Sequence, residues 1–451
     1  MSSEPARRPW RDSLSVYAHP RVRAMLFLAF SAGLAFPLVL TTLSLRLRES
    51  GIDRTTIGLF SLVGLAYSLK FFWSPVVDRM PLPLLGRLGR RRSWMLLAQG
   101  GIFAGLVSMA LHDPAQDAAR MALLAVLTAF AAATQDIAID AWRIEAVDTS
   151  MQGTMAAAYS VGYQIALICG GAGALTAASA FGWTTSYLIM AACVGVGVVT
   201  TLMISEPDAH IDRATLAQET RVISFLERSA HWPQSLRSAV AWIIGAVVCP
   251  FVDFFARNGV KHGLPILALI VTYRLNYTTM GVAALTFYHD LGFTLNQIAL
   301  VSKLYGVLMT LSGGVIGGLL VVRYGIPRTL LVGWALLTVA NLLYAYVADI
   351  HPGIWWLATV VSFDNVANGI AGTAFIAYMS SLTSIAYTAT QYALFGTLWS
   401  LPAKSLASLW GTIVDAVGYR PFFVYTALVG LPALLLILRL MRQPPALPAN
   451  A

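Results

Sequence analysis

The sequence predicts an all-α integral membrane protein with twelve transmembrane helices in two six-helix halves. Of its 451 residues, 57% are hydrophobic and only 11% are charged, whereas soluble proteins carry about 25% charged residues. The apolar residues form runs close to the roughly 20 residues that cross a bilayer as a helix. Basic residues gather before the first run, in the connection after the second run and in the polar stretch between the sixth and seventh runs. Such a chain is expected to expose its apolar surface to lipid.

The apolar runs fall into two groups of six with a polar stretch between them. The first group lies at about 22–45, 55–76, 93–112, 120–143, 153–180 and 184–204. The second group lies at about 264–288, 295–322, 328–348, 354–381, 389–416 and 421–440. We expect each run to form one membrane-spanning helix.

A further apolar run at 238–256 complicates the count. It is short and ends with Pro250, Asp253 and Arg257, which favours an interfacial or partly inserted helix over a full span. The alternative, a thirteenth span, would place the C-terminus on the other side of the membrane.

The distribution of basic residues distinguishes these alternatives. With a cytoplasmic N-terminus, twenty of the thirty Lys and Arg residues fall in internal segments and five fall in external loops. The positive-inside rule therefore favours twelve spans with both termini cytoplasmic. The net charge of +9 is explained by this topology and by contact with membrane lipid, so we expect no nucleic-acid partner.

The expected organisation follows from these boundaries. It comprises a cytoplasmic N-terminus at 1–21, an N-terminal half at 22–204, a cytoplasmic linker at 205–263, a C-terminal half at 264–440 and a cytoplasmic tail at 441–451.

Charged residues at the end of the fourth predicted span point to transport. A charge at the centre of a membrane helix costs about 2.5–3.5 kcal/mol on insertion scales, so such residues usually serve a function. Asp136, Asp140 and Arg143 share one helix face at spacings of four and three residues. Arg143 could hold Asp140 ionised while Asp136 exchanges protons, or the three residues could form a static network. Asp364 in the tenth span is the other candidate for proton coupling.

The two halves also carry traces of a repeat. Asp136 in the fourth span corresponds to Asp364 in the tenth, and Asp140 corresponds to Asn368. Both correspondences have the same offset of 228 positions. Two related six-helix halves with a binding site between them are the major facilitator arrangement.

The loop after the second span resembles the cytoplasmic motif of the major facilitator superfamily. Its acid and arginines are expected to latch helices together and to separate during transport. We assign this gating role to Asp78, Arg79, Arg90, Arg91 and Glu145.

Four further cations lie within or near predicted spans. Lys70, Arg274, Lys303 and Lys404 could line a cavity for an anionic substrate. Alternatively, they could extend toward the membrane surface or neutralise buried acids.

Several motifs resemble the AmpG family of muropeptide permeases over most of the chain, from about 22 to 440. They are KFFWSPVVDR at 70–79, TQDIAIDAWR at 134–143, FDN at 363–365 and TQYAL at 390–394. The resemblance implies a multi-pass protein of the bacterial inner (cytoplasmic) membrane. It also implies import of GlcNAc-1,6-anhydroMurNAc peptides with protons for peptidoglycan recycling and, in species with an inducible enzyme, β-lactamase induction.

Such a cargo carries hydroxyls, acetamido groups, an apolar sugar face and carboxylates, so its site needs aromatic rings, amides and cations. The proposed binding residues are Gln135, Trp142, Arg143, Tyr273, Arg274, Asn276, Lys303, Asn365, Gln391, Lys404 and Lys70. Further residues expected near the cavity are Tyr159, Tyr163, Tyr277, Phe363, Phe395, Trp399 and Asn368.

One departure from the family concerns the seventh span, where members often carry an acid. Here the corresponding run is Tyr273 to Tyr277, and no acid occurs between Lys261 and His289. Proton coupling would then rest on Asp136, Asp140 or Asp364, or would differ from that of the family.

Other classes of protein fit less well. The chain lacks the common metalloprotease, serine-hydrolase and phosphate-loop motifs, and its seven histidines and three cysteines are scattered. We therefore expect neither an enzyme nor a cofactor or metal site, and we expect a monomer. The remaining alternative is a transporter of the same superfamily for a siderophore or another peptide-like anion. An acetyl-CoA carrier is disfavoured because no cation cluster suits a nucleotide's phosphates.

Overall fold

The computed structural model describes residues 16–442 apart from 53–55, 58–59, 84, most of 208–247, 351–352 and 408. Every element in the described part of the chain is helical.

The N-terminal half contains long helices interrupted by short helical turns. Its elements are η1 (Val16–Ala18), α2 (Pro20–Val39), α3 (Thr41–Glu49), η2 (Ser61–Gly64), α5 (Leu65–Leu69), η3 (Lys70–Phe72), α6 (Ser74–Arg79), η4 (Leu85–Leu88), α7 (Arg90–Leu111), α8 (Ala118–Glu145), η5 (Thr149–Met151), α9 (Gln152–Ile168), η6 (Cys169–Gly173), α10 (Ala174–Cys193) and α11 (Gly195–Met203).

The C-terminal half repeats this pattern. Its elements are α14 (Cys249–Thr272), α15 (Leu275–Asp290), α16 (Leu295–Ile298), η8 (Ala299–Tyr305), α17 (Gly306–Tyr324), α18 (Ile326–Val347), α19 (Ile354–Leu382), η9 (Ile385–Tyr387), α20 (Thr388–Ala407), α21 (Trp410–Val417), α22 (Tyr419–Val429) and α23 (Leu431–Arg442).

Each of the twelve predicted spans coincides with one helix or with consecutive helical segments. Among the described residues, eight continuous helices are long and apolar enough to cross a membrane. One of these, Gln152–Met203, covers two predicted spans. Its chain reverses at Gly182, where φ is +80°, a value that only glycine adopts readily.

The second predicted span differs from a continuous helix. Residues 61–79 form four short helical pieces, and the last begins at Ser74 with Pro75 in its first turn. Proline has no N–H to donate to the preceding turn, so a helix running into it breaks. Lys70 lies at this break, and its side chain reaches the charged residues of α8.

The apolar run at 238–256 lies partly outside the described residues. Its described end belongs to α14, which bends at Gly259 with φ of +67°. The piece before the bend packs against the start of α20, because Gln391 donates a 2.8 Å hydrogen bond to the carbonyl of Pro250. The expected start of the second half, residue 264, falls within α14.

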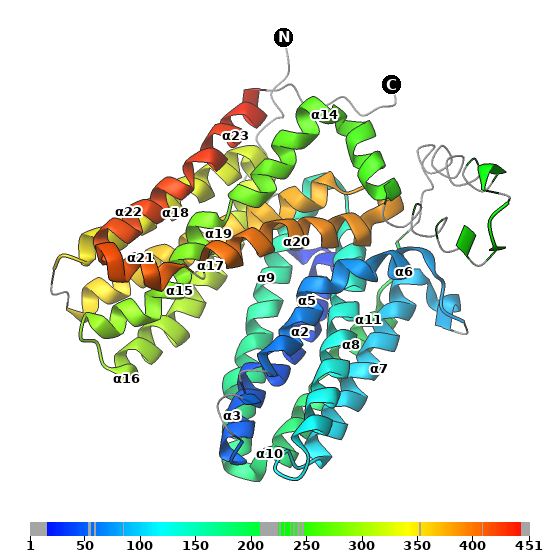
Figure 1. Cartoon of the computed structure of the whole chain (residues 1–451), viewed down its shortest axis with the longest axis horizontal. Helices are drawn as coiled ribbons and strands as arrows, with labels where there is room; N and C mark the ends of the chain where they lie inside the picture. Colours follow the sequence, from blue (N-terminus) through cyan, green and yellow to red (C-terminus); the bar gives the residue numbers. More distant parts are fainter. Residues whose placement is uncertain are drawn as a thin grey trace.

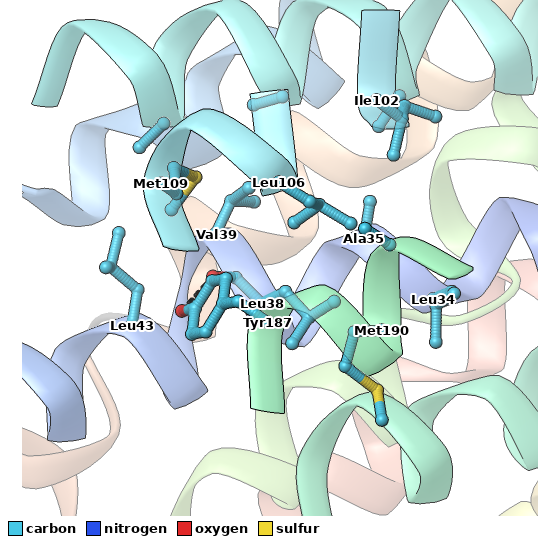
Figure 2. Close-up of a cluster of buried hydrophobic side chains, with 14 of the residues drawn as sticks. Leu34, Ala35, Leu38, Val39, Leu43, Ile102, Leu106, Met109, Tyr187 and Met190 are labelled. Carbon is cyan, nitrogen blue, oxygen red and sulfur yellow. Dashed lines mark hydrogen bonds between the residues drawn. The ribbon is translucent and has the colours of Figure 1, made fainter. Parts of the chain in front are cut away.

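Each half contains an apolar core of its own. In Figure 2, Leu34 and Leu38 of α2, Leu106 of α7 and Tyr187 of α10 pack in one such cluster. The Tyr187 hydroxyl donates to the carbonyl of Leu38 at 2.9 Å, which satisfies a polar group in an apolar environment.

Small residues allow close packing in the C-terminal half. A Cβ atom at Gly369 of α19 would lie 2.4 Å from the carbonyl oxygen of Thr310 on α17. Membrane helices associate largely through such small-residue contacts, because lipid tails are as apolar as leucine.

The two halves meet at one end of the molecule and diverge at the other (Figure 1). They approach each other around α6, α9 and α20, and they separate toward α3 on one side and α16 on the other. Helix α2 begins and α23 ends at the end where the halves meet (Figure 1). We call this the latch end.

Candidate functional site

Two carboxylates on α8 share one lysine. The Nζ atom of Lys70 lies 3.7 Å from Oδ2 of Asp136 and 3.4 Å from Oδ2 of Asp140. Arg143 adds a second cation, with Nη2 at 3.5 Å from Oδ1 of Asp140. We call these four residues the acidic centre.

Asp136 is incompletely satisfied within this centre. Its side chain is 9% exposed, and its buried Oδ1 has no hydrogen-bond partner among the described residues. A buried polar oxygen without a partner is energetically costly and calls for an explanation, such as a bound water or proton. The geometry therefore suits a carboxylate that exchanges a proton or a ligand.

Arg143 connects the acidic centre to the other half. Its Nη1 donates a 2.8 Å hydrogen bond to the hydroxyl of Ser380 on α19. Its guanidinium carbon also lies 5.5 Å from the ring centre of Tyr159 and 5.0 Å from that of Tyr392. A change in the charge of Asp140 would therefore alter the interactions of Arg143, which also bonds to the other half.

A second polar group occupies the corresponding place in the C-terminal half. Arg274, at the break between α14 and α15, donates a 2.5 Å hydrogen bond to Oδ1 of Asn368. The rings of Tyr277 and Trp399 lie 5.0 and 5.7 Å from its guanidinium carbon. Asp364 lies one turn before Asn368, and its buried Oδ1 has no hydrogen-bond partner in the described part of the chain.

The sequence repeat thus has a structural counterpart. Asp140 and Asn368 occupy equivalent repeat positions and each contacts a cation from another segment, Lys70 and Arg274 respectively. Asp136 and Asp364 lie one turn earlier, and each has one buried oxygen without a hydrogen-bond partner among the residues that the structure describes.

A cavity of about 240 Å³ lies between the halves. Tyr159, Tyr163 and Gln164 of α9 line one side, and Arg274 and Asn368 line the other. The two tyrosine rings are stacked with centres 5.8 Å apart. The cavity therefore combines aromatic faces, amides and one cation.

The latch end is closed by a buried carboxylate. Asp78 accepts hydrogen bonds from the backbone N–H groups of Ala389 and Thr390, at 3.1 and 2.7 Å, where α20 begins. Arg91 pairs with Asp78 at 2.8 Å and with Glu145 at 2.5 Å, and its side chain is fully buried. Unpaired N–H groups at a helix start favour an anion, so Asp78 links the halves.

Two more of the proposed gating residues lie beside this group. Arg90 donates a 2.7 Å hydrogen bond to the carbonyl of Asp78 and lies 3.8 Å from Glu145. Arg79 reaches the other half, where its guanidinium carbon is 5.5 Å from the ring centre of Tyr387. Burial raises the pKa of Tyr387 to about 12, opposed in part by Arg79, so the phenol stays neutral at physiological pH.

Some of the proposed binding residues serve packing within the N-terminal half. Gln135 is buried and donates a 2.7 Å hydrogen bond to Ser31 of α2. Trp142 is fully buried, and its indole N–H donates to the carbonyl of Ser205 at 3.1 Å. Both lie on faces of α8 other than that of the acidic centre, so the structure does not bring them to the cavity.

In the C-terminal half, two of the proposed binding residues also serve packing. Tyr273 is fully buried, donates to the carbonyl of Leu330 at 3.0 Å and stacks on Phe375. Asn276 is also fully buried, and a Cβ atom at Gly430 would lie 3.2 Å from its Nδ2. Both residues face helices of their own half rather than the cavity.

Gln391 holds the bent start of α14 instead of lining the cavity. Its amide oxygen accepts from the backbone of Ser384 at 2.7 Å and from Arg257 at 3.2 Å, while its Nε2 donates to Asp253 at 2.9 Å. With all these bonds made within the C-terminal half, the side chain has a structural role here.

The last three proposed binding residues are Asn365, Lys303 and Lys404. Asn365 accepts a 2.7 Å hydrogen bond from Thr310 and donates to the carbonyl of Val361 at 2.8 Å. The side chains of Lys303 and Lys404 lie outside the described part of the structure.

Several residues that the structure places at these sites were not predicted from the sequence. Gln164 lines the cavity, and a polar residue directly after Tyr163 in an apolar run was a detectable signal. Ser380 had no such signal, and Thr390 was noted only as the first residue of the TQYAL motif. Glu206 also went unnoticed, although its carboxylate accepts from the backbone N–H groups of Arg91 and Arg92 at 2.7 and 3.1 Å.

Comparison with known proteins identifies the family to which this fold belongs. Residues 25–403 and 266–451 match the family model of the Major Facilitator Superfamily. The anhydromuropeptide permease of Escherichia coli (strain K12) is 31% identical over 427 residues, covering 94% of this chain and 80% of that protein. A Rickettsia felis protein that carries the name AmpG 4 is 30% identical over 430 residues, covering 95% and 98%.

A solved structure has the same fold at low identity. The major facilitator superfamily transporter FucP in the outward conformation matches with a TM-score of 0.64 at 14% identity, covering 95% of this chain and all of FucP. The family match, the long relatives and the two-half helical fold agree, and the chain belongs to the AmpG family of the major facilitator superfamily.

Proposed function

We propose that this protein imports peptidoglycan fragments, GlcNAc-1,6-anhydroMurNAc with or without a peptide, into the cytoplasm together with protons. It would act in the bacterial inner membrane as a monomer with both termini cytoplasmic. The observation that carries this proposal is a cavity between the halves that is lined by Arg274 and by Tyr159. The ring centre of Tyr159 lies 5.5 Å from the guanidinium carbon of Arg143 in the acidic centre. The E. coli relative is named an anhydromuropeptide permease, which supports the cargo class.

The cavity lining suits parts of that cargo. Stacked Tyr159 and Tyr163 offer aromatic faces for the apolar side of an anhydro-sugar. Gln164 and Asn368 can exchange hydrogen bonds with hydroxyl and acetamido groups. Arg274 can pair with a peptide carboxylate, an interaction stronger than a neutral hydrogen bond. At about 240 Å³, the cavity is smaller than the roughly 300–1,000 Å³ of typical ligand pockets, so in this state it would hold one part of the cargo.

The latch supports transport by alternating access. With the latch end cytoplasmic, the bonds from Asp78 to the start of α20 close the path to the cytoplasm. Release of cargo then requires those bonds and the Arg143–Ser380 bond to break. Protonation of a carboxylate in the acidic centre would change which partner Arg143 prefers and so couple the proton to this movement.

The test is uptake of labelled anhydro-muropeptide into proteoliposomes with and without an inward proton gradient. We expect accumulation above equilibrium only with the gradient. Saturable equilibration that ignores the gradient would retain the cargo and contradict proton coupling. If correctly folded protein takes up no muropeptide under either condition, the cargo assignment is wrong, and a siderophore or another peptide-like anion becomes the next ligand to assay.

A further inference from the structure

A second, larger cavity lies outside the transport path. It has a volume of about 950 Å³ and lies at the latch end between the start of α2 and the end of α11. Trp142 contributes to its lining, and Phe27, Val199 and Met203 line it with side chains that are 50%, 57% and 82% exposed. These apolar side chains lie on helices that span the membrane, so the cavity opens toward lipid.

Basic residues from one helix start surround the polar end of this cavity. His19, Arg21 and Arg23 all belong to its lining. Arg21 donates from Nη1 to the carbonyl of Ala146, which holds its guanidinium at the site. Arg23 is exposed, and its guanidinium has no hydrogen-bond or ion-pair partner within the described part of the chain.

No carboxylate among the lining residues offsets these charges. Glu206 follows Ser205 of the lining, but its carboxylate oxygens accept from the backbone N–H groups of Arg91 and Arg92 at the start of α7. The cavity therefore has a cationic rim at the start of α2 and an apolar wall along the apolar helices α2 and α11.

We infer that this cavity binds an anionic glycerophospholipid. The phosphodiester would lie against Arg21 and Arg23, and an acyl chain would lie along Phe27, Val199 and Met203. Charge complementarity selects this occupant, because basic pockets between membrane helices attract anionic headgroups. The leaflet would be the cytoplasmic one if the orientation in the proposed function holds.

The experiment measures lipid retention by the full-length protein in detergent, using native mass spectrometry. Phosphatidylglycerol and phosphatidylethanolamine of identical acyl chains compete at equal concentration, so only the headgroup differs. We expect the wild-type protein to prefer phosphatidylglycerol. Arg23→Gln should weaken phosphatidylglycerol binding about fivefold, the factor that corresponds to about 1 kcal/mol for one basic residue near a membrane surface. Arg23→Glu should abolish the preference.

The matched control is Arg442→Glu, which changes the charge of an exposed arginine at the same end of the molecule but outside the cavity. It should retain the wild-type preference. Free glycerol phosphate at the same concentration should not compete, since it lacks the acyl chains. Equal retention of the two lipids by the wild-type protein would overturn the proposal, as would unchanged selectivity in Arg23→Glu. None of these measurements depends on transport, so this result stands apart from that of the uptake assay.

Discussion

Arg143 of α8 and Ser380 of α19 are joined by a 2.8 Å hydrogen bond, although 237 positions separate them in the chain. The same guanidinium lies 3.5 Å from Asp140. One side chain thus contacts both a carboxylate of the acidic centre and the opposite half. In the proposed mechanism, this side chain links proton binding at α8 to the movement of the halves.

The Arg143–Ser380 bond should stabilise the state that is closed at the latch end. A hydrogen bond to a charged group contributes about 1.5–3 kcal/mol, so Ser380→Ala should shift the equilibrium toward opening. Hydrogen exchange at the start of α20 should accelerate by at least about tenfold. Ser381→Ala is the matched control, since among the described residues that hydroxyl bonds only to the carbonyl of Tyr378 in its own helix. Equal exchange in both variants would contradict the linking role.

Asp136→Asn should abolish proton-driven accumulation while preserving folding and membrane insertion. Asparagine keeps the size of the side chain but cannot release a proton, so only equilibrative transport should remain. Proteoliposome uptake with and without a gradient, together with counterflow, separates the two activities. Asp349→Asn is the control, because Asp349 is an exposed residue paired with Arg420. Normal accumulation by Asp136→Asn would exclude its role in coupling.

Arg274→Gln should raise the KM for peptide-bearing cargo more than for the bare disaccharide. Loss of a charge-assisted bond worth about 1.5–3 kcal/mol corresponds to a factor of roughly 10–100. Arg274→Lys keeps the charge and should show a smaller effect. Initial uptake rates over a range of concentrations give both KM values. If the two cargoes respond equally, Arg274 does not bind the peptide carboxylates.

Asp78→Asn should weaken closure at the latch end. The change removes a buried charge that pairs with Arg91, and breaking a buried pair costs about 3–5 kcal/mol. We expect normal insertion but strongly reduced transport, and faster hydrogen exchange at Ala389 and Thr390. Asp148→Asn, at an exposed position nearby in the N-terminal half, should behave like the wild type. Transport at the wild-type rate in Asp78→Asn would rule out a gating role.

Gly369→Ala should destabilise the C-terminal half. The added Cβ would lie 2.4 Å from the carbonyl oxygen of Thr310 and 2.6 Å from the backbone nitrogen of Gly314, and overpacking of this kind costs about 1–3 kcal/mol. Gly100→Ala has nothing within 4 Å and should leave stability unchanged or raise it slightly. Thermal unfolding in detergent measures both. A similar Tm for the two variants would contradict the close packing of α17 and α19.

The helix positions and the charged centres could be predicted from the sequence. Asp136 and Asp140 stand out because charges are rare in apolar runs, and the equivalent spacing of Asp364 and Asn368 revealed the repeat. The second span was harder to predict. Its hydropathy predicts one helix, while the structure breaks it before Pro75 and so brings Lys70 to the carboxylates.

The linear order of residues was sufficient for the fold class and the succession of helical segments, because lipid imposes hydropathy and length on each segment. The cytoplasmic position of both termini stays a prediction. The linear order was not sufficient to identify the side chains that meet in the cavity. Gln135 and Asp136 are neighbours, yet one packs against Ser31 and the other approaches Lys70. Helix rotation and partners distant in the chain decide that difference, because neighbouring residues on a helix point about 100° apart.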